Sequence, residues 1–162
     1  MNYILFEDKF TRFLKPFTDM HASFEVRCGQ FKNFERVLSL LDPTDLLTLI
    51  VRKEIEELLS DRYENITINP ETIEPGLWLN GATIWDDKLL EKVSDGKSYA
   101  NEDLLFAFSE TSDNDFNKVK ELILSKIMIT SQIEFPHISF LWDAISESHH
   151  QIKEDFVKKF PV

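Results

Sequence analysis

The chain has 162 residues, of which 18 are Lys or Arg and 29 are Asp or Glu, so its formal net charge at pH 7 is −11. This length fits one domain with a sizeable core, and a hydrophobic fraction of 43% is ordinary for a globular protein. So large a negative charge repels phosphate backbones and anionic bilayers, which argues against nucleic acid and membrane surfaces as partners.

Cysteine usage and hydropathy indicate a cytoplasmic protein. The only cysteine, Cys28, excludes an internal disulfide and a cysteine metal cluster, as is typical of a reducing compartment. No run reaches the roughly 18 apolar residues that a membrane-spanning helix needs, and no signal peptide is recognisable at the N-terminus. We therefore expect a soluble, acidic, cytoplasmic protein with a single domain over residues 1–162.

The first half of the chain alternates predicted strands with predicted helices. A short apolar strand is expected at residues 3–6, and a continuous apolar run at 46–51 predicts a central strand that is buried on both faces. Apolar residues at helical spacing predict helices at 31–41 and 53–63. Two isoleucines that alternate with polar residues predict a short strand at 65–69.

The second half of the chain continues this alternation. Asp86 is suited to cap a short helix that ends near Val93. The other predicted elements are a strand at 76–84, paired strands at 97–100 and 104–108, a helix at 115–128, and a helical or strand-to-helix ending at 138–160. Strands that alternate with helices favour a three-layer α/β fold with a mostly parallel sheet.

Six segments of the chain, taken in order, resemble one bacterial family of sugar nucleotidyltransferase-like domains. Related domains form the first half of an alternative type of N-acetylglucosamine-1-phosphate uridyltransferase that is fused to an acetyltransferase. The segments are Asn2-Tyr-Ile-Leu-Phe-Glu-Asp8, Leu14-Lys-Pro-Phe-Thr18, Val26-Arg-Cys-Gly29, Leu77-Trp-Leu-Asn-Gly81, Asp103-Leu-Leu-Phe-Ala-Phe108, and Trp142-Asp143 followed by Ile152-Lys-Glu-Asp-Phe156. Together they span nearly the whole chain.

This resemblance implies a fold and a reaction. The implied fold is a Rossmann-like sheet of the nucleotide-diphospho-sugar transferase type, truncated relative to full-size enzymes. The implied reaction joins a sugar 1-phosphate to a nucleoside triphosphate with Mg²⁺ as cofactor and releases pyrophosphate. The nucleotide and the sugar phosphate would lie over the carboxyl ends of the strands, where parallel α/β sheets bind ligands.

The resemblance also implies which cations would hold the phosphates. Arg27 is the first candidate catalytic residue, because a guanidinium binds phosphate oxygens in a bidentate fork. Arg36 stands where relatives have a Lys, and is the second candidate. From the sequence alone, however, Arg27 is equally well a surface ion-pairing residue, and Arg36 lies on an amphipathic helix where a solvated role is common.

Four further residues are candidate substrate-binding residues. Asn80 ends a predicted buried strand, at the place where better-known nucleotidyltransferases have a metal-binding Asp, and Gly81 follows it. Asp8 and Asp103 are acids at strand ends that would orient sugar, base or metal, although no set of metal ligands is identified. The alternative for the Asn80-Gly81 pair is a simple turn, and for the acids a helix cap or a solvated position.

Two departures from the family pattern leave a second reading open. Relatives tend to read Phe-Thr-Arg-Pro where this chain reads Phe-Thr-Asp19-Met20, and they tend to have an Arg soon after the Asn, where this chain has Ala82-Thr83. The loss of two phosphate-facing cations favours a non-catalytic sugar-nucleotide-binding or protein-assembly module. Such a module would pair with an acetyltransferase or form a homodimer through exposed aromatic residues, since some of the 14 Phe should lie at the surface.

Overall fold

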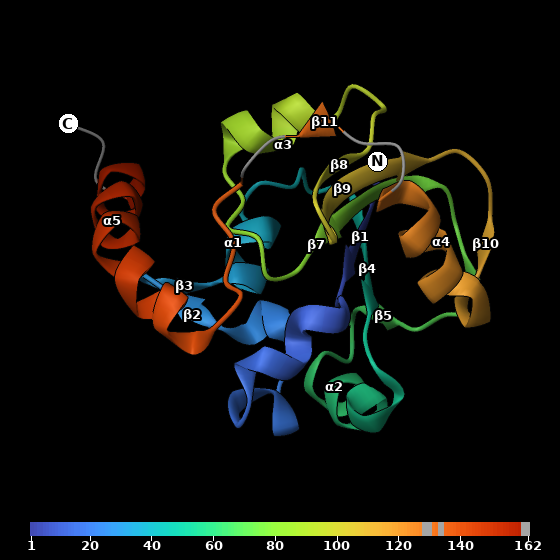
Figure 1. Ribbon diagram of the computed structural model, residues 1–162, viewed down its shortest axis with the longest axis horizontal. Coiled ribbons are helices and arrows are strands. Elements are labelled where there is room, and N and C mark those ends of the chain that lie inside the picture. Colours follow the sequence, from blue (N-terminus) through green and yellow to red (C-terminus); the bar gives the residue numbers. More distant parts are fainter. Residues whose placement is uncertain (128–130, 133–134, 160–162) are drawn as a thin grey trace.

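A seven-stranded sheet organises the structure, a computed structural model that describes residues 1–127, 131–132 and 135–159 (Figure 1). Its strand order is β11-β8-β9-β7-β1-β4-β5. The strands are β1 (Asn2–Phe6), β4 (Leu46–Ile50), β5 (Thr67–Ile68), β7 (Gly76–Asn80), β8 (Tyr99–Asn101), β9 (Leu104–Glu110) and β11 (Ser131–Gln132). The first strand of the chain is therefore an interior strand of the sheet, which agrees with its apolar sequence.

The sheet is mostly parallel, as predicted. Strand β1 pairs in parallel with β4 on one side and with β7 on the other, and β5 and β11 also pair in parallel with their neighbours. Only β9 runs antiparallel to the strands beside it, β7 and β8. Parallel pairs need crossover connections, and the helices of the chain supply them.

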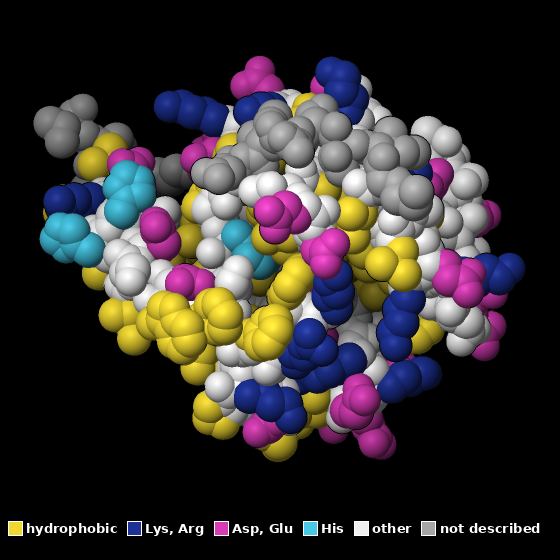
Figure 2. Space-filling view, in the orientation of Figure 1, with side chains coloured by type: hydrophobic (Ala, Val, Ile, Leu, Met, Phe, Trp, Pro, Cys, Tyr) yellow, Lys and Arg dark blue, Asp and Glu magenta, His cyan; other side chains and the backbone are white. Residues whose placement is uncertain are grey.

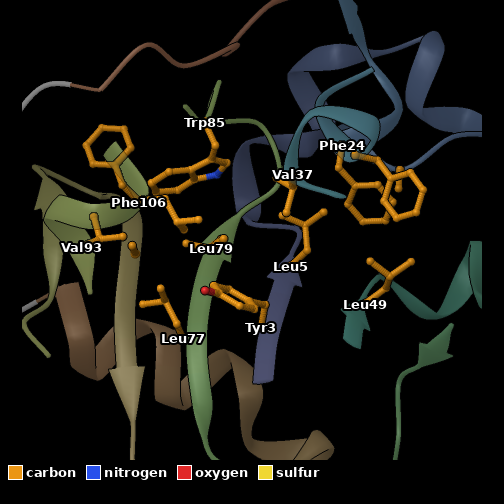
Figure 3. Close-up of a cluster of buried hydrophobic side chains, with 14 of the residues drawn as sticks. Tyr3, Leu5, Phe24, Val37, Leu49, Leu77, Leu79, Trp85, Val93 and Phe106 are labelled. Atoms are coloured by element: carbon orange, nitrogen blue, oxygen red, sulfur yellow. The ribbon is translucent and has the colours of Figure 1, made fainter. Parts of the chain in front are cut away.

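Helices cover both faces of the sheet, which gives the three layers of the predicted α/β fold. Side chains of β1 alternate between the two faces, so that Tyr3 and Leu5 enter one core cluster while Ile4 and Phe6 enter the other. Figure 3 shows the first cluster, which three helices cover, and α4 covers the second. The helices are α1 (Asn33–Leu38), α2 (Glu56–Arg62), α3 (Asp87–Val93), α4 (Val119–Ile127) and α5 (Leu141–Lys159).

Smaller elements complete the domain. The 3₁₀ helices are η1 (Lys9–Leu14), η2 (Phe17–Asp19), η3 (Ser23–Glu25), η4 (Lys53–Ile55) and η5 (Phe116–Lys118). Two antiparallel strand pairs lie outside the main sheet: β2 (Arg27–Cys28) with β3 (Phe31–Lys32), and β6 (Thr72–Ile73) with β10 (Asn114–Asp115). Helix α5 packs on β2 at one side of the molecule, away from the main sheet (Figure 1).

Three element predictions were wrong in part. The strand predicted at 76–84 ends at Asn80, because the chain turns at the next two residues. The predicted helix at 31–41 begins only at Asn33, because the two residues before it pair with β2 in a hairpin that turns at Gly29. The predicted strand at 46–51 is buried on both faces only near its end: Leu46 is 61% exposed, whereas Leu49 is fully buried. Strand β5, which flanks it, has two residues and leaves the first half of β4 uncovered.

The tryptophans divide between the core and the surface. Trp78 and Trp85 are buried, whereas Trp142 on α5 is 61% exposed. Cys28 is buried as a free thiol. Residues 128 and 160, which end the elements predicted at 115–128 and 138–160, lie outside the described residues. Within the described part of the chain, no helix combines the length and the apolar character needed to cross a bilayer.

Candidate functional site

A cleft of about 910 Å³ opens at the carboxyl ends of the central parallel strands. Glu7 and Asp8, which directly follow β1, line it together with Val51 and Arg52, which directly follow β4. The opposite wall is formed by residues of α4 and by Leu105 at the start of the antiparallel strand β9. This edge of the sheet is where open parallel α/β folds bind their ligands.

The cleft concentrates positive charge in an acidic protein. Among the described residues, six Lys and Arg side chains line it, against five carboxylates, so this lining carries one excess positive charge, whereas the formal net charge of the chain is −11. Figure 2 shows dark-blue side chains gathered around this hollow. The cations are Lys9, Arg12, Lys15, Arg52, Lys53 and Lys120, and the acids are Glu7, Asp8, Asp19, Glu54 and Asp103.

Asp8 fixes the start of η1 beside the cleft. One carboxylate oxygen accepts a hydrogen bond from the backbone N–H of Phe10 at 2.8 Å, and the other accepts from Nδ2 of Asn80 at 2.7 Å. Burial raises the pKa of Asp8, although the hydrogen bond from Asn80 opposes this shift. The carboxylate therefore holds the cation-bearing segment against the ends of β1 and β7.

Asn80 is buried beneath Asp8 and connects three parts of the sheet edge. Its Nδ2 also donates to the backbone oxygen of Leu105 at 2.8 Å, and its Oδ1 accepts from the backbone N–H of Ala82 at 2.9 Å. Gly81, the next residue, packs so closely on Phe24 that an added Cβ would lie 2.9 Å from a ring carbon. Asn80 thus lies just below the floor of the cleft, whereas Gly81 packs against Phe24 and the end of β1.

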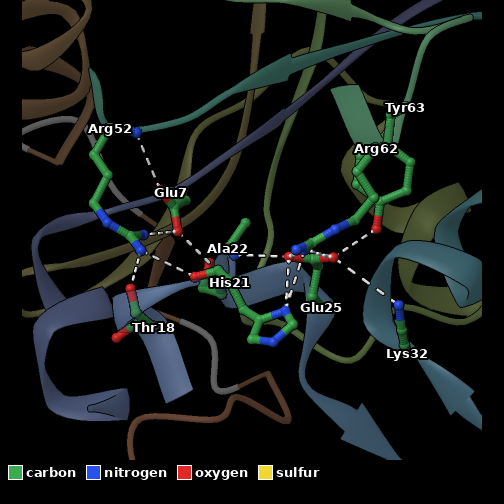
Figure 4. Close-up of polar contacts among 10 residues, drawn as sticks. Glu7, Thr18, His21, Ala22, Glu25, Lys32, Arg52, Arg62 and Tyr63 are labelled. Carbon is green, nitrogen blue, oxygen red and sulfur yellow. Dashed lines mark hydrogen bonds and ion pairs between the residues drawn. The ribbon is translucent and has the colours of Figure 1, made fainter. Parts of the chain in front are cut away.

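Glu7 and Arg52 tie a loop to the strand ends (Figure 4). Glu7 accepts from the backbone N–H of Ser23 at 2.8 Å and from Nη1 of Arg52 at 2.6 Å. The other guanidinium nitrogen of Arg52 donates to the backbone oxygens of Thr18 and His21. Burial raises the pKa of Glu7, and the charge of Arg52 opposes that shift. Arg52 is thus committed to the fold, although it lines the cleft.

The remaining cleft cations are less constrained. Lys9 pairs with Asp103 at 2.8 Å, Lys15 with Asp19, and Lys53 with Glu56, all through exposed lysines. Exposed ion pairs of this kind contribute about 0–1 kcal/mol, so an incoming phosphate can replace the acid. Among the described residues, Arg12 and Lys120 form no ion pair, and both side chains are exposed. They are the cleft cations most available to an anionic ligand.

Thr11 contributes an unpaired polar group to the same wall. The residue is 7% exposed, and its Oγ1 has no hydrogen-bond partner among the described residues. Buried hydroxyl groups are nearly always hydrogen-bonded, and an exception calls for a water or a ligand oxygen.

The structure brings together some of the predicted site residues and separates others. Asp8 and Asp103 line the cleft and Asn80 lies just beneath Asp8, whereas Gly81 contacts Phe24 and Asn33 away from the cleft. Arg27 and Arg36 do not line it.

The two predicted arginines lie instead on the side of the domain that faces α5. Arg36 is a buried residue, 5% exposed. Its guanidinium donates to the carboxylate of Asp155 on α5 at 2.5 Å and to the backbone oxygen of Cys28 at 2.9 Å. Arg27 is exposed on β2, where it donates to the backbone oxygen of Gln30 and lies 3.8 Å from Glu35. Both arginines are therefore engaged within the β2–β3 and α5 region.

Sequence reasoning missed most of the cleft cations. Two of them, Arg52 and Lys53, could have been found by their position, because they come just after the strand β4, as Asp8 comes just after β1. Residues at the carboxyl end of a central parallel strand should be candidates by position. No such signal marked Lys120, which comes from α4 and reaches the cleft only through the packing of that helix on the sheet.

The cleft offers carboxylates to a divalent cation but no preformed cage. The described residues contain no group of three or more His, Cys, Asp or Glu positioned to hold a metal ion. Mg²⁺ is commonly held by one or two carboxylates together with substrate phosphates, and Asp8 and Asp103 both face the cleft. The residues present therefore fit a cation that arrives with a triphosphate.

A second buried acid stabilises the loop that borders the site. Glu25 accepts from Arg62 at 2.6 Å, from the hydroxyl of Tyr63 at 2.8 Å, and from the backbone N–H of Ala22 at 3.0 Å (Figure 4). Burial raises the pKa of Glu25, but these hydrogen bonds outweigh burial and the net shift is downward. The network fastens the segment between η2 and β2 to α2.

Comparison with known proteins identifies the family. The sequence model of a family described as sugar nucleotidyl transferase matches residues 3–159, so the chain belongs to this family. The crystal structure of a putative glucose-1-phosphate thymidylyltransferase from Bacillus anthracis, in complex with a sucrose, is similar in fold. The two share 11% sequence identity and a TM-score of 0.51, over 93% of this chain and 94% of that one. No curated protein sequence matches the chain.

Proposed function

We propose that this protein is a sugar-1-phosphate nucleotidyltransferase whose substrates meet in the cleft at the carboxyl ends of β1 and β4. In this reaction an oxygen of the sugar 1-phosphate attacks the α-phosphorus of a nucleoside triphosphate. The bond from that phosphorus to the β-phosphate oxygen breaks, and pyrophosphate leaves with the bonding electron pair. The family membership and the fold support the reaction class.

One observation carries the proposal: six cations line the cleft of a chain whose net charge is −11. Both substrates are polyanions, and both need positive charge where their phosphates lie. In an acidic protein, cations that gather in a cleft point to an anionic ligand there. Catalysis of phosphoryl transfer is mainly positioning and charge stabilisation, which is what such a lining provides.

The residues of the proposed site fall into three groups. Arg12 and Lys120, together with Lys9 once Asp103 releases it, would hold phosphate oxygens. Thr11 would donate its unpaired hydroxyl to the same ligand. Arg27 and Arg36 would act in catalysis only in a conformation in which they leave their present partners within the protein and bind phosphate oxygens instead.

Mg²⁺ is the proposed cofactor, since enzymes of this class usually need a divalent cation. Bound Mg²⁺ would neutralise charge on the triphosphate and on the leaving pyrophosphate. Asp103, which is exposed on the cleft wall, is the best placed carboxylate to hold it, and Asp8 is the second. Asn80 would act by holding the Asp8 carboxylate in place through the 2.7 Å hydrogen bond.

The second candidate function is a module that binds a sugar nucleotide without turnover. The observation that favours it is that the polar groups at the cleft floor already have partners within the protein: each oxygen of Asp8 accepts one hydrogen bond, and both the oxygen and the nitrogen of the Asn80 amide are hydrogen-bonded. The ligand site of such a module would still be the cationic cleft. Partners such as an acetyltransferase belong to this alternative.

Thermal unfolding with nucleoside triphosphates and sugar nucleotides, each with and without Mg²⁺, tests both functions. A ligand at 100 times its dissociation constant stabilises the fold by about 2.7 kcal/mol, which moves the unfolding temperature by several degrees. Each ligand that shifts it is then assayed for pyrophosphate release with a panel of sugar 1-phosphates. Release supports the enzyme, a shift without release supports the binding module, and no shift with any ligand contradicts both.

Variants locate the binding site. Arg12→Gln and Lys120→Gln should each weaken triphosphate binding about 10- to 100-fold, because each removes a charge-assisted contact of about 1–3 kcal/mol. Lys88→Gln is the matched control, since Lys88 is exposed on α3 and does not line the cleft. Equal affinities for all three variants would exclude the cleft as the phosphate site.

A further inference from the structure

The cationic cleft also has an apolar surface that the proposed function does not use. Its side chains come from η5 and α4 and are Phe116, Val119, Ile123, Leu124 and Ile127, which we call the α4 wall. Figure 2 shows yellow apolar side chains directly beside the dark-blue ones at this hollow. Phosphate groups gain nothing from contact with hydrocarbon, so a wall of this kind suits a different part of a ligand.

Helical spacing places the wall and a cation on one face of α4. Val119, Ile123 and Ile127 are separated by four residues each, and Lys120 and Leu124 form the neighbouring row at the same spacing. Residues four apart lie above one another on a helix, about 6 Å apart along its axis. This face of the cleft therefore presents hydrocarbon one turn beyond a cation.

Leu124 has the highest exposed fraction of the wall. It lines the cleft and is 56% exposed, whereas Val119 is 6% exposed and belongs to the core cluster beneath α4. Phe116, Ile123 and Ile127 are partly buried against the same cluster. The wall is thus anchored in the core and is open to the cleft at Leu124.

The side chains of this wall offer little hydrogen bonding to a ligand. Among the described side chains of η5 and α4 that line the cleft, only those of Asn117 and Lys120 are polar. The amide nitrogen of Asn117 already donates to Oδ1 of Asp115 at 3.0 Å. A site that holds a ring through carbon contacts separates similar ligands by far smaller factors than a site that reads their hydrogen-bonding groups.

The combination of charge and hydrocarbon identifies the part of the ligand that fits the wall. Arg12 and Lys120 require an anionic ligand, and the wall requires an apolar group about one helical turn from the anion. A nucleoside triphosphate has this layout, because its base has apolar faces and only the ribose separates the base from the phosphates. The sugar of a sugar 1-phosphate fits less well, since its hydroxyl groups would be unpaired against hydrocarbon.

We propose that the α4 wall is the base-binding subsite of the cleft, and that it holds the base of a nucleoside triphosphate by apolar contact rather than by hydrogen bonds. The inference rests on the proposed function, because it takes the triphosphate to lie at the cleft cations. A cleft of about 910 Å³ has room for both parts of the ligand, since ligand pockets measure roughly 300–1,000 Å³. The four common bases should then bind with similar affinities.

Isothermal titration calorimetry at fixed Mg²⁺ tests the proposal with ATP, GTP, CTP, UTP and inorganic tripolyphosphate, which has no base. The four nucleotides should bind the unchanged protein within about tenfold of one another. Leu124→Ala should weaken the binding of each nucleotide about 3- to 10-fold, because apolar contact with the base is lost, and should leave the affinity for tripolyphosphate unchanged.

Leu46→Ala is the matched control. Leu46 is 61% exposed, undergoes the same substitution and does not line the cleft, so all five affinities should stay as they are in the unchanged protein. Alanine is the best helix former, so Leu124→Ala should keep α4 intact. Thermal unfolding of the two variants at the same temperature would show that Leu124→Ala is folded.

Two results would overturn the base subsite and leave the phosphate site in place. One is an equal effect of Leu124→Ala on nucleotides and tripolyphosphate, or no effect on either, which would put the base elsewhere. The other is a preference of more than about 100-fold for one base, which would show that hydrogen-bonding groups read it. If none of the five ligands binds, the proposed function fails and the base subsite fails with it.

Discussion

At the scale of single residues, three carboxylates with little exposure are each held by an arginine from a distant part of the chain. Removal of one partner from such a pair leaves an uncompensated buried charge, which costs far more than the pair contributes. These arginines are thereby committed to the fold, and the proposed ligand of the cleft would depend on Arg12 and on lysines for positive charge. The pairs are Glu7–Arg52, Glu25–Arg62 and Asp155–Arg36, at 2.6, 2.6 and 2.5 Å.

The Glu25 network predicts a pH-dependent loss of stability on substitution. Glu25→Gln should lower the free energy of unfolding by about 1–3 kcal/mol at pH 7, because Arg62 and Tyr63 lose a charged acceptor. The folded pKa of Glu25 lies below its ordinary value, so its contribution is complete above the unfolded pKa of about 4.3. That contribution is lost as the pH falls through the folded pKa.

Urea denaturation from pH 7 down to the acid limit measures this difference. The gap between the unchanged protein and Glu25→Gln should stay constant above about pH 5 and then narrow as the pH falls. Glu57→Gln is the control, because Glu57 is exposed on α2 and should change stability by less than about 0.5 kcal/mol. A gap that is independent of pH would show that the charge of Glu25 is not what stabilises the loop.

At the scale of secondary-structure elements, hydrophobic periodicity predicted most strands and helices but not their tertiary partners. The apolar runs at 3–6 and 46–51 are β1 and β4, and Asp86 caps α3 through a 2.8 Å bond to the N–H of Leu89, as its position suggested. The β2–β3 hairpin could not be predicted locally. Gly29 turns it with φ of 74°, and an added Cβ there would lie 2.5 Å from Oδ2 of Asp155.

The candidate site shows the same division. Asp8 and Asp103 could be found because they flank strands whose ends meet at one edge of the sheet. The burial of Arg36 could not be predicted, because its partner Asp155 is 119 residues away in the sequence and no sequence pattern links the two residues. Sequence analysis therefore predicted the wrong surroundings for side chains whose position depends on long-range packing.

The attachment of α5 therefore rests on a contact that a single substitution removes. Asp155→Ala should destabilise the protein by about 3–5 kcal/mol, because it leaves Arg36 buried without its carboxylate. The loss of the 2.9 Å bond from the backbone N–H of Gln30 adds to that cost. Chemical denaturation measures it, with Glu154→Ala, the exposed neighbour on α5, as the control.

A double variant separates the charge from the packing. Arg36→Met with Asp155→Leu replaces both charged groups by apolar ones of similar size, and should recover most of the stability that Asp155→Ala loses. If Asp155→Ala is no more destabilising than Glu154→Ala, the Arg36–Asp155 pair does not hold α5, and Arg36 becomes available again for a role with phosphate.

At the scale of the whole molecule, charge is separated: a strongly acidic protein has a cationic cleft. A triphosphate bound as proposed would be attracted by Arg12, Lys120 and the other cleft cations over a few ångströms, and repelled by acids spread over the rest of the surface. Salt acts differently on the two effects, because the screening length is about 30 Å at 0.01 M, about 10 Å at 0.1 M and about 3 Å at 1 M.

The affinity for a nucleoside triphosphate should therefore pass through a maximum as salt increases at fixed Mg²⁺. Between about 0.01 and 0.1 M, distant repulsion is screened while the cleft contacts remain, so affinity rises; above about 0.1 M, the cleft contacts weaken and affinity falls. Isothermal titration calorimetry measures both limbs. The double variant Arg12→Gln, Lys120→Gln should keep the rise in affinity at low salt and lose much of the fall at high salt. If the affinity of the unchanged protein falls steadily from the lowest salt concentration, attraction by the cleft outweighs repulsion by the net charge of −11 at every distance.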